Sequence, residues 1–349
     1  MEPVRLVVAG LGSWGPRWAQ LISEQEGVSL AAVVEPMDER RHKVVENLGL
    51  SPQQAHADLD IALREVEADA VVVVTPPQTH LDVASRALAA GKAVLVEKPL
   101  AGTLSDARAI VEAAEQAGQI LVVSQNYRYR PPMVTLKAAI ERGDIGSIDA
   151  ISGDCQEDMR LFYEATNFRY LMEHPYIIDM TIHHWDLLRY LTGQDVKHVH
   201  AQSWRVPDSP YQHDPACAIL LVMEDGTPVH YEGSGATYRR RTSWSSWWEF
   251  IGEQGRLWTD GGVDEPHADI VHRRMFGQNE EILPYEPSAP LDTIGSLRAF
   301  VTAVRGGPVP AHNGRDNLQS LAVVMACVAS VERGEIVKVA EILAGERRS

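Results

Sequence analysis

Short apolar runs alternate with longer helical patterns over residues 1–124. The apolar runs occupy residues 4–9, 29–34, 70–74, 93–96 and 120–124. Because strands that are apolar throughout are buried on both faces, these runs indicate a parallel sheet covered by helices. Gly91 and Gly118 are expected to end helices, and Ser105 to cap the helix over residues 107–117. The pattern predicts a doubly wound α/β domain.

The pattern changes after Asn126, where the strand candidates become consecutive. These candidates are residues 197–205, 216–223, 228–236 and 246–251. Helical patterns occur at residues 133–142, 176–191, 293–305 and 313–333. A tight turn at residues 224–227 is a hairpin signal, and consecutive strands joined by such turns form mostly antiparallel sheets. We therefore expect two domains, residues 1–124 and an α+β domain over residues 125–349.

Composition restricts the partners and the compartment. The 349 residues carry a net charge of −16, which argues against binding to nucleic acid or to an anionic membrane surface. The three cysteines lack CxxC spacing, which is typical of a protein in a reducing compartment. The first residues do not resemble a signal peptide, and no apolar stretch approaches the roughly 18 residues of a membrane span. A cytoplasmic location is expected.

A glycine-rich turn between the first strand and the first helix is the candidate cofactor site. Its residues are Gly10, Gly12, Ser13, Trp14 and Gly15. Such glycines allow a tight turn and close approach of a pyrophosphate to the helix N-terminus. Glu35 ends the second strand, where an acid binds the adenosine ribose and repels a 2′-phosphate, so NAD is favoured over NADP. Arg40 and Arg41 either attract a phosphate or form a solvated helix face, and the solvated face is favoured.

Polar residues also follow the next two strands. Thr75, Pro76 and His80 either wrap the nicotinamide side of a dinucleotide or simply end a strand. Glu97 and Lys98 follow the run at 93–96. Ligands of open α/β sheets bind outside the carboxyl ends of the strands. Lys98 is therefore expected to meet a substrate hydroxyl, and Glu97 is assigned to the cofactor side.

Asp179 and His183 are spaced i, i+4 on one predicted helix. The carboxylate either fixes the imidazole tautomer for acid–base chemistry or forms a cap or solvated pair. Asp186 is expected to make a structural hydrogen bond. His183 and His184 point in different directions and there is no His-Glu-x-x-His spacing, so no metal site is predicted.

Together these motifs resemble the Gfo/Idh/MocA family of oxidoreductases over nearly the whole chain. They occur in the family's order: the glycine-rich turn, Thr75-Pro76-Pro77 with His80, Glu97-Lys98-Pro99, and Asp179 with His183-His184. The resemblance implies an N-terminal Rossmann domain and a C-terminal domain with an open-faced sheet that often mediates oligomers, here a homodimer or homotetramer. It also implies oxidation or reduction of a sugar, inositol or related polyol by NAD(P).

By position, the resemblance implies that Lys98 contacts the reacting hydroxyl and that His183 exchanges its proton with support from Asp179. Which of Lys98 and His183 is the immediate acceptor stays open. The chain departs from the family pattern in two places. Trp18 stands where many members carry histidine, and Glu173-His174-Pro175-Tyr176 replaces a glycine-rich segment.

Substrate contacts are expected at the entry to the second domain and on the catalytic helix. Tyr127 and Arg128 either hydrogen-bond substrate hydroxyls or a carboxylate, or take an interdomain salt-bridge role, and His184 is assigned to the substrate. Aromatic residues in strands are more often core than platform. The candidates for a sugar-stacking platform, Trp244, Trp247 and Trp248, are accordingly expected mainly in the core or an interface, and Arg239-Arg240-Arg241 faces an anionic substrate or water.

The expected activity is hydride transfer between NAD and a secondary alcohol. The cofactor carries the difficult step, so the protein has to supply binding, orientation and a base. Two alternatives remain: a glycosidase that uses NAD for transient oxidation and elimination, and a non-catalytic NAD-binding regulatory protein.

Overall fold

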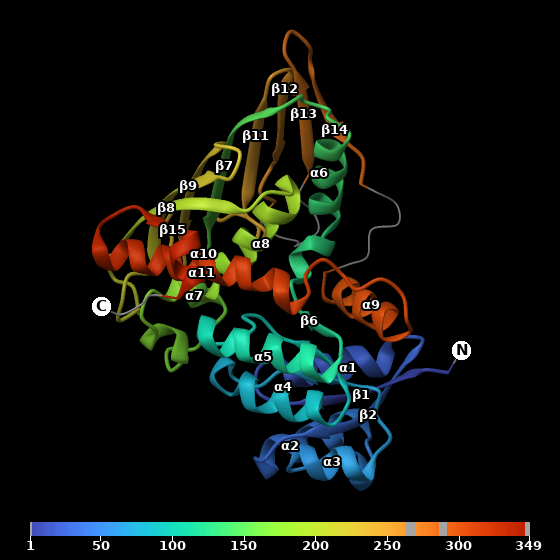
Figure 1. Ribbon diagram of the computed structural model, residues 1–349. Helices are drawn as coiled ribbons and strands as arrows, with labels where there is room; N and C mark the ends of the chain where they lie inside the picture. The colour runs from blue at the N-terminus through green and yellow to red at the C-terminus, as the bar shows by residue number, and fades with distance from the viewer. Residues whose placement is uncertain (1, 263–269, 286–291, 346–349) are drawn as a thin grey trace. The chain divides into compact units, whose positions relative to one another are not determined.

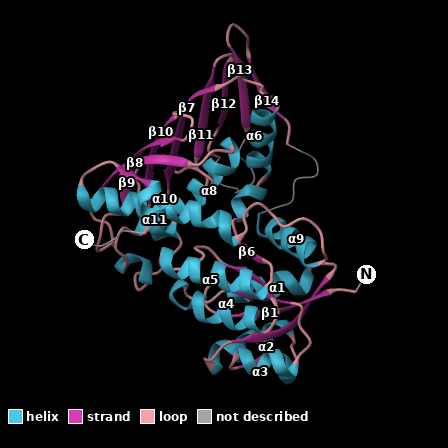
Figure 2. Cartoon of the chain, in the orientation of Figure 1, coloured by secondary structure: helices cyan, strands magenta, loops and turns pink. Residues whose placement is uncertain are grey.

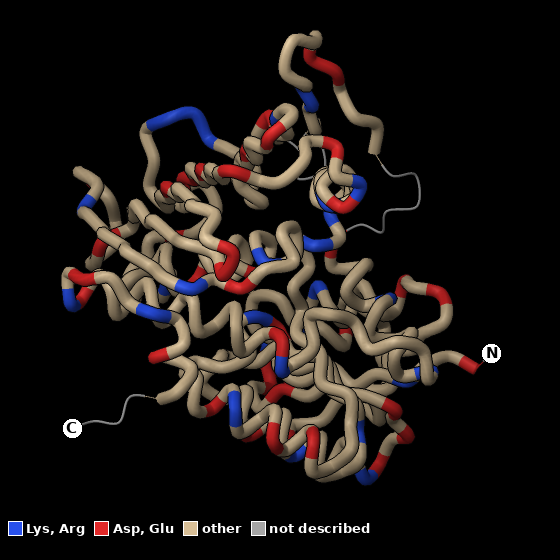
Figure 3. Tube along the Cα trace, turned by 45° about the horizontal axis from the view of Figure 1, so that its top comes forward, with Lys and Arg blue, Asp and Glu red and all other residues tan. Residues whose placement is uncertain are grey.

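The computed structural model describes residues 2–262, 270–285 and 292–345. It divides into two compact units, each made of two chain segments (Figure 1). Unit 1 comprises Met1–Gln125 and Thr293–Leu318, and unit 2 comprises Asn126–Asp292 and Gln319–Ser349. Acidic and basic residues are interspersed along both units, with 48 acidic against 32 basic residues (Figure 3).

Unit 1 contains a six-stranded sheet with the order β3-β2-β1-β4-β5-β6, and all of its pairings are parallel. Its strands are β1 (Val4–Ala9), β2 (Val28–Val34), β3 (Ala55–His56), β4 (Ala70–Val73), β5 (Ala93–Val96) and β6 (Leu121–Val123). Every residue of β4 and β5 is buried, as their continuous apolar sequence predicts. The doubly wound class is confirmed. The two-residue strand β3 has no apolar run and was not predicted.

Helices connect the strands of unit 1. They are α1 (Gly15–Glu24), α2 (Asp38–Leu48), α3 (Leu59–Glu65), α4 (His80–Ala89) and α5 (Leu104–Ala117). The expected cap of α5 at Ser105 is wrong, because Ser105 lies inside the helix. The cap is Thr103, whose hydroxyl accepts a hydrogen bond from the Asp106 N–H at 3.0 Å. Gly118 ends α5 in the left-handed conformation, as expected.

A later segment of the chain completes the core of unit 1. Helix α9 (Asp292–Val304) contributes Leu297, Phe300 and Val301 to the cluster that contains the apolar residues of β1 and β2. After α9, the Val123 N–H donates to the His312 carbonyl at 3.1 Å, so the chain also lies beside β6. The predicted boundary near residue 124 placed residues 293–318 in the second domain, whereas their contacts are with the first.

Unit 2 contains a nine-stranded sheet with the order β14-β13-β12-β11-β7-β10-β9-β8-β15. Its strands are β7 (Ile148–Gln156), β8 (Val196–Trp204), β9 (Ala216–Met223), β10 (Pro228–Ser234), β11 (Trp247–Gly252), β12 (Gly255–Thr259), β13 (Val271–Met275), β14 (Glu280–Leu283) and β15 (Val337–Lys338). Among the described strands of this second sheet, only β7 and β10 pair in parallel, so the mostly antiparallel prediction is confirmed.

The helices of unit 2 lie against one face of this sheet (Figure 2). They are α6 (Pro131–Glu141), α7 (Pro175–Asp179), α8 (Thr181–Thr192), the later part of α10 (Gly314–Arg333) and α11 (Val339–Ala344). Exposed and buried residues alternate along β9, which is typical of a sheet covered on one face. The open-faced sheet is therefore present in unit 2.

The helix predicted over residues 176–191 is interrupted at Met180, which separates α7 from α8. The Thr181 hydroxyl donates to the Ile177 carbonyl at 2.6 Å. In a continuous helix the Thr181 N–H would bond that carbonyl, and back-bonding of this kind bends helices. Asp179 thus ends α7, and His183 is the third residue of α8.

Candidate active site

The turn from β1 into α1 has three glycines with different roles. Gly10 has φ +98°, and a Cβ there would lie 2.8 Å from the Thr75 nitrogen. A Cβ at Gly15 would overlap the Gly10 carbonyl oxygen. A Cβ at Gly12 would meet no described atom within 4 Å. Gly10 and Gly15 close the turn, while Gly12 borders open space near the helix N-terminus.

The remaining two residues of the turn lie at the start of α1. Trp14 is the residue before the helix, and its side chain is 44% exposed with the Arg17 guanidinium 5.2 Å from its ring centroid. Ser13 precedes it and is also exposed. Both residues are therefore accessible at the start of the helix.

Glu35 at the end of β2 is 5% exposed and is oriented by two backbone N–H groups. Leu11 donates to Oε2 at 2.8 Å and Met37 to Oε1 at 3.1 Å. Arg41 folds back to bond the Glu35 carbonyl and to pair with Asp38. The solvated face expected of these arginines is therefore right for the exposed Arg40 and wrong for Arg41, whose side chain is 16% exposed.

His80, the first residue of α4, joins the turns that follow β4 and β5. Its Nε2 lies 2.8 Å from the Thr75 carbonyl oxygen, and its Nδ1 lies 3.1 Å from that of Pro99. The ring is buried, and this burial lowers the pKa of His80 against the opposing effect of the carbonyls. The imidazole thus lies between the Thr75 and Pro99 carbonyls of the two strand-end turns, and in its neutral form it donates to one of them.

Glu97 and Lys98 directly follow β5, at the carboxyl end of the parallel strands. The Glu97 carboxylate accepts hydrogen bonds from the Trp18 indole at 2.7 Å and from the Lys98 backbone N–H at 3.1 Å. Desolvation raises the pKa of Glu97. Lys98 is partly exposed, and its peptide bond to Pro99 is cis. Trp18, one of the departures from the family pattern, thus anchors the residue beside Lys98.

In unit 2, His183 stacks on Tyr127. The two ring centroids are 4.0 Å apart with an interplanar angle of 10°. Tyr127 comes from the short 3₁₀ helix η3 (Asn126–Tyr129), and both side chains are buried. The structure therefore brings the predicted base and a predicted substrate contact into direct contact with each other.

Asp179 forms an ion pair with Arg169, whose Nε lies 2.6 Å from Oδ2. Arg169 belongs to the 3₁₀ helix η5 (Phe168–Leu171), and its guanidinium also lies 4.8 Å from the Tyr163 ring centroid. The carboxylate and guanidinium side chains are 17% and 14% exposed. No motif in the sequence pointed to Arg169, because the pair joins separate short helices.

Arg128 and His184, both expected to contact substrate, have protein partners in the interior of unit 2. Arg128 binds both oxygens of Asp186 at 2.6 Å in a buried bidentate pair. His184 lies 2.6 Å from the Tyr231 hydroxyl and 3.0 Å from the Trp244 carbonyl oxygen. The structural role expected of Asp186 is confirmed.

The three tryptophans near β11 differ in exposure. Trp248 is fully buried and donates to the Ser245 carbonyl at 2.7 Å, so the core assignment is confirmed for it. Trp247 is partly exposed. Trp244 is partly exposed beside the Phe162 ring, with centroids 5.1 Å apart. Of the three, Trp244 has the exposed aromatic surroundings that a stacking platform needs.

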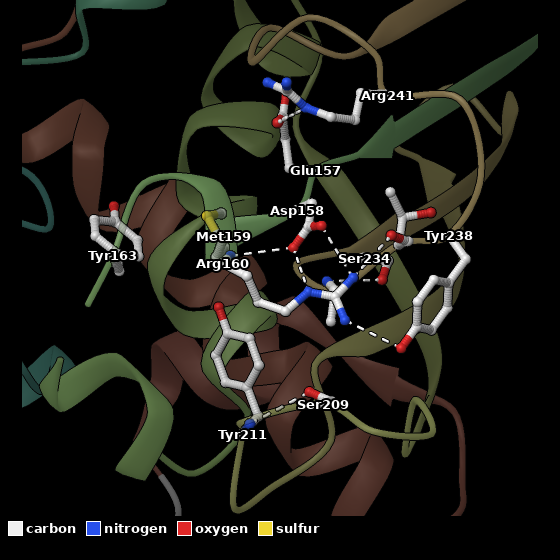
Figure 4. A network of polar contacts seen from close by, with 12 residues as sticks. Glu157, Asp158, Met159, Arg160, Tyr163, Ser209, Tyr211, Ser234, Tyr238 and Arg241 are labelled. Atoms are coloured by element: carbon white, nitrogen blue, oxygen red, sulfur yellow. Dashed lines mark hydrogen bonds and ion pairs between the residues drawn. The ribbon is translucent and has the colours of Figure 1, made fainter. Parts of the chain in front are cut away.

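A polar network follows the end of β7 (Figure 4). Glu157 has no exposed surface, and its Oε2 pairs with the Arg241 guanidinium at 3.0 Å. Burial raises the pKa of Glu157 to about 7, against the opposing charge of Arg241. Asp158 binds Arg160 beside it, and Arg160 reaches the Tyr238 hydroxyl at 3.1 Å. Sequence reasoning did not single out Glu157.

The described residues hold no cluster of three or more His, Cys, Asp or Glu side chains placed to bind a metal ion. Within the same part of the chain, none of the helices has the length and apolar character needed to span a membrane.

A parallel sheet with a glycine-rich first turn and an acid after the second strand defines a dinucleotide-binding protein of the α/β class.

Comparison with known proteins gives the family. A model described as "Oxidoreductase family, NAD-binding Rossmann fold" matches residues 4–125, and the "GFO/IDH/MocA C-terminal domain" model matches residues 133–258. The chain belongs to the Gfo/Idh/MocA family of oxidoreductases, and its relatives include named sugar and inositol dehydrogenases.

Three similar proteins illustrate the family. D-apiose dehydrogenase of Paraburkholderia graminis is 28% identical, over 90% of this chain and 84% of its own. Myo-inositol 2-dehydrogenase of Thermotoga maritima is 25% identical, over 97% and 100%. An Agrobacterium radiobacter oxidoreductase, solved with NAD+, L-tartaric acid and magnesium, superposes with a TM-score of 0.85 at 23% identity, over 97% and 99%. The last shows that the fold is shared.

Proposed function

We propose that this protein is an NAD-dependent dehydrogenase that transfers a hydride between nicotinamide and a secondary alcohol of a sugar, inositol or related polyol. The proposal rests on the position of Lys98 after β5. Glu35 follows β2 and the glycine-rich turn follows β1, so all three lie at the carboxyl end of the parallel strands. The relatives named as D-apiose and myo-inositol dehydrogenases support this substrate class.

The residues present fit a dinucleotide. The open space at Gly12 suits a pyrophosphate, and the carboxylate of Glu35 is already oriented by two N–H groups. When bound, the nicotinamide exchanges the hydride with the alcohol carbon. Glu35 would hold the adenosine ribose, and the turn residues would hold the phosphates. His80, Thr75 and Pro76 would shape the nicotinamide side.

The protein's own part in the reaction is to orient the hydroxyl and to move its proton. Lys98 donates a hydrogen bond to the hydroxyl oxygen, and His183 takes the proton during oxidation and returns it during reduction. Asp179 supports His183, and Arg169 holds the Asp179 carboxylate in place at 2.6 Å. In the assignment we favour, Lys98 orients the hydroxyl and His183 is the acceptor.

We propose NAD rather than NADP as the cofactor. Glu35 would repel a 2′-phosphate, and Arg41, the nearest candidate to neutralise one, is already paired with Asp38. The kcat/KM measured with NAD should therefore exceed that with NADP. A Glu35→Gln variant keeps the side-chain length and removes the charge. It should therefore reduce the ratio of kcat/KM with NAD to kcat/KM with NADP. Equal kcat/KM values in the parent protein would contradict the assignment.

The decisive experiment is a screen of sugars, inositols and glycosides with NAD and NADP, followed by absorbance of the reduced cofactor. On any active substrate, Lys98→Met should lower kcat by about 100-fold or more while NADH binding remains measurable by fluorescence. Lys197→Met, at an exposed position on β8, is the matched control and should keep full activity. Full activity in Lys98→Met would overturn the proposal.

The same screen separates the alternatives. Release of a sugar from a glycoside without accumulation of NADH would identify a glycosidase that uses NAD transiently. Tight NAD binding without turnover of any polyol would identify a regulatory protein. Each outcome contradicts the dehydrogenase proposal in a different way.

We further propose a homodimer or homotetramer that forms through the open face of the sheet in unit 2. Leu220 on β9 and Ile282 on β14 are 49% and 61% exposed, and an interface through this face of the sheet would cover these apolar side chains. Light scattering of the purified protein tests this, and a monomer at micromolar concentration would contradict it. We place the protein in the reducing cytoplasm, because the three cysteines are free and buried.

A further inference from the structure

Three planar groups stack beside α8. The His183 imidazole and the Tyr127 phenol are nearly parallel, with centroids 4.0 Å apart. The Arg130 guanidinium lies 3.6 Å from the same Tyr127 centroid. Both neighbours cannot occupy one face of the ring at these distances, so they lie on opposite faces. Tyr127 is therefore sandwiched between a guanidinium and an imidazole.

The outer member of the stack is itself fixed. Arg130 is 4% exposed and donates from Nη2 to Asp292 at 3.2 Å and from Nη1 to the Ser245 hydroxyl at 3.1 Å. Asp292 also accepts a hydrogen bond from Asn126, at the start of η3. The guanidinium therefore cannot slide off the phenol without breaking its bonds to Asp292 and Ser245. This support holds the plane of Tyr127 and, through it, the plane of His183.

We infer that Tyr127 is a positioning residue that sets the plane of the His183 imidazole. Arg130 packs on the opposite face of Tyr127 and holds that ring in place. This inference rests on the proposed role of His183 as the proton acceptor. A side-chain base works only when its nitrogen is held close to the productive direction, and packing against a rigid neighbour supplies that restraint. Burial holds the pKa of Tyr127 well above its usual range, so its phenol stays neutral and does not compete as an acid or base.

The positioning role differs from the substrate contact expected for Tyr127. Both faces of the ring are covered, so a substrate can reach only its edge and hydroxyl. Tyr127→Phe keeps the faces and removes the hydroxyl, whereas Tyr127→Leu removes the faces as well. If Tyr127 has a positioning role, Tyr127→Phe should keep the kcat and KM of the parent protein. If the Tyr127 hydroxyl contacts the substrate, Tyr127→Phe should raise KM.

The first test needs no activity. An imidazole stacked on a phenol has ring-current-shifted C–H resonances, which NMR of histidine-labelled protein detects and a His183→Gln variant assigns. We expect Tyr127→Phe to keep the upfield position of the His183 signals and Tyr127→Leu to move them toward ordinary histidine values. Tyr190→Leu is the matched control, because Tyr190 also lies on α8 and packs against a different arginine, Arg128. It should leave the signals in place.

The second test uses a substrate found in the screen. Tyr127→Leu should lower kcat by about 10- to 100-fold through loss of orientation, with KM changed by less than about threefold. Tyr127→Phe should restore kcat. Unmoved His183 resonances in Tyr127→Leu, or a rise of KM in Tyr127→Phe, would overturn the inference. If no substrate is found, unmoved His183 resonances in Tyr127→Leu still overturn the inference, so its failure is distinguishable from failure of the proposed function.

Discussion

Glu97 illustrates how one carboxylate can position its neighbour. Its two oxygens accept hydrogen bonds from the Trp18 indole and from the Lys98 backbone N–H. Both donors would lose their acceptor if the Glu97 side chain turned away, and a buried donor left without an acceptor is costly. The backbone at Lys98 is thus restrained from β5 and from α1 together.

A double-mutant cycle of Trp18→Phe and Glu97→Leu measures this restraint. The single changes and the double change are compared by urea unfolding at neutral pH. We expect a coupling free energy of about 1–3 kcal/mol, because the buried indole N–H would otherwise lose its acceptor. Trp14→Phe in the same helix region serves as the control, since Trp14 is 44% exposed. Coupling near zero would show that the hydrogen bond does not contribute.

Glu157 makes the stability of unit 2 depend on pH. Its pKa is raised from 4.5 to about 7 by burial, so the folded state binds a proton that the unfolded state releases between those values. Where the folded state binds more protons, stability falls as pH rises. The stabilisation is complete below about pH 4.5 and is lost as pH rises through 7. The full change is about 3 kcal/mol.

Glu157→Gln should flatten this part of the stability profile. Its free energy of unfolding, measured in urea at several pH values, should fall less between pH 5 and 8 than that of the parent, because the amide does not titrate. Glu164→Gln, at an exposed position without a comparable partner in the interior, should follow the parent profile. Parallel profiles for Glu157→Gln and the parent would contradict the prediction.

Candidate site residues could be predicted where their position beside a strand or turn identifies them. Residues whose role depends on a partner far away in the sequence could not be predicted. Glu35 was identifiable because it follows a strand, and Lys98 for the same reason. Arg169 pairs with Asp179 across two short helices, and Arg130 depends on Asp292, which is 162 positions away. No spacing rule connects such pairs, so only the folded chain reveals them.

At the scale of elements, hydrophobic periodicity located most strands, while hydrogen bonds decided where helices begin and break. Thr103 and Ser105 are both able to cap a helix by residue type. The structure selects Thr103, because the backbone there is extended and its hydroxyl reaches the Asp106 N–H. The break at Met180 depends similarly on the Thr181 hydroxyl rather than on a proline or glycine within the helix.

Thr103→Ala and Ser105→Ala separate these two candidates for the cap. Removal of a helix cap costs about 1 kcal/mol of stability, so Thr103→Ala should lower the free energy of unfolding by about that amount. Ser105→Ala lies inside the helix, where alanine has the higher propensity, and should be neutral or slightly stabilising. Thermal and urea unfolding of both variants tests this. A larger loss in Ser105→Ala would contradict the cap assignment.

At the scale of the whole molecule, the chain completes the core of unit 1 only after it has built most of unit 2. The apolar face of α9 resembles that of any amphipathic helix, so the sequence alone does not tell which domain it covers. The structure shows that Leu297, Phe300 and Val301 belong to the cluster built by β1 and β2. Folding of unit 1 therefore requires contacts between residues almost 300 positions apart.

Phe300→Ala tests this organisation in the full-length protein. Phe300 is fully buried, and loss of a buried phenylalanine ring costs about 3–5 kcal/mol. Because its neighbours lie in unit 1, hydrogen exchange should become faster in peptides of β1 and β2, while β9 and β10 of unit 2 keep their protection. Val309→Ala, at a position 52% exposed, should leave both regions unchanged. Faster exchange confined to β9 and β10 would instead assign α9 to the stability of unit 2.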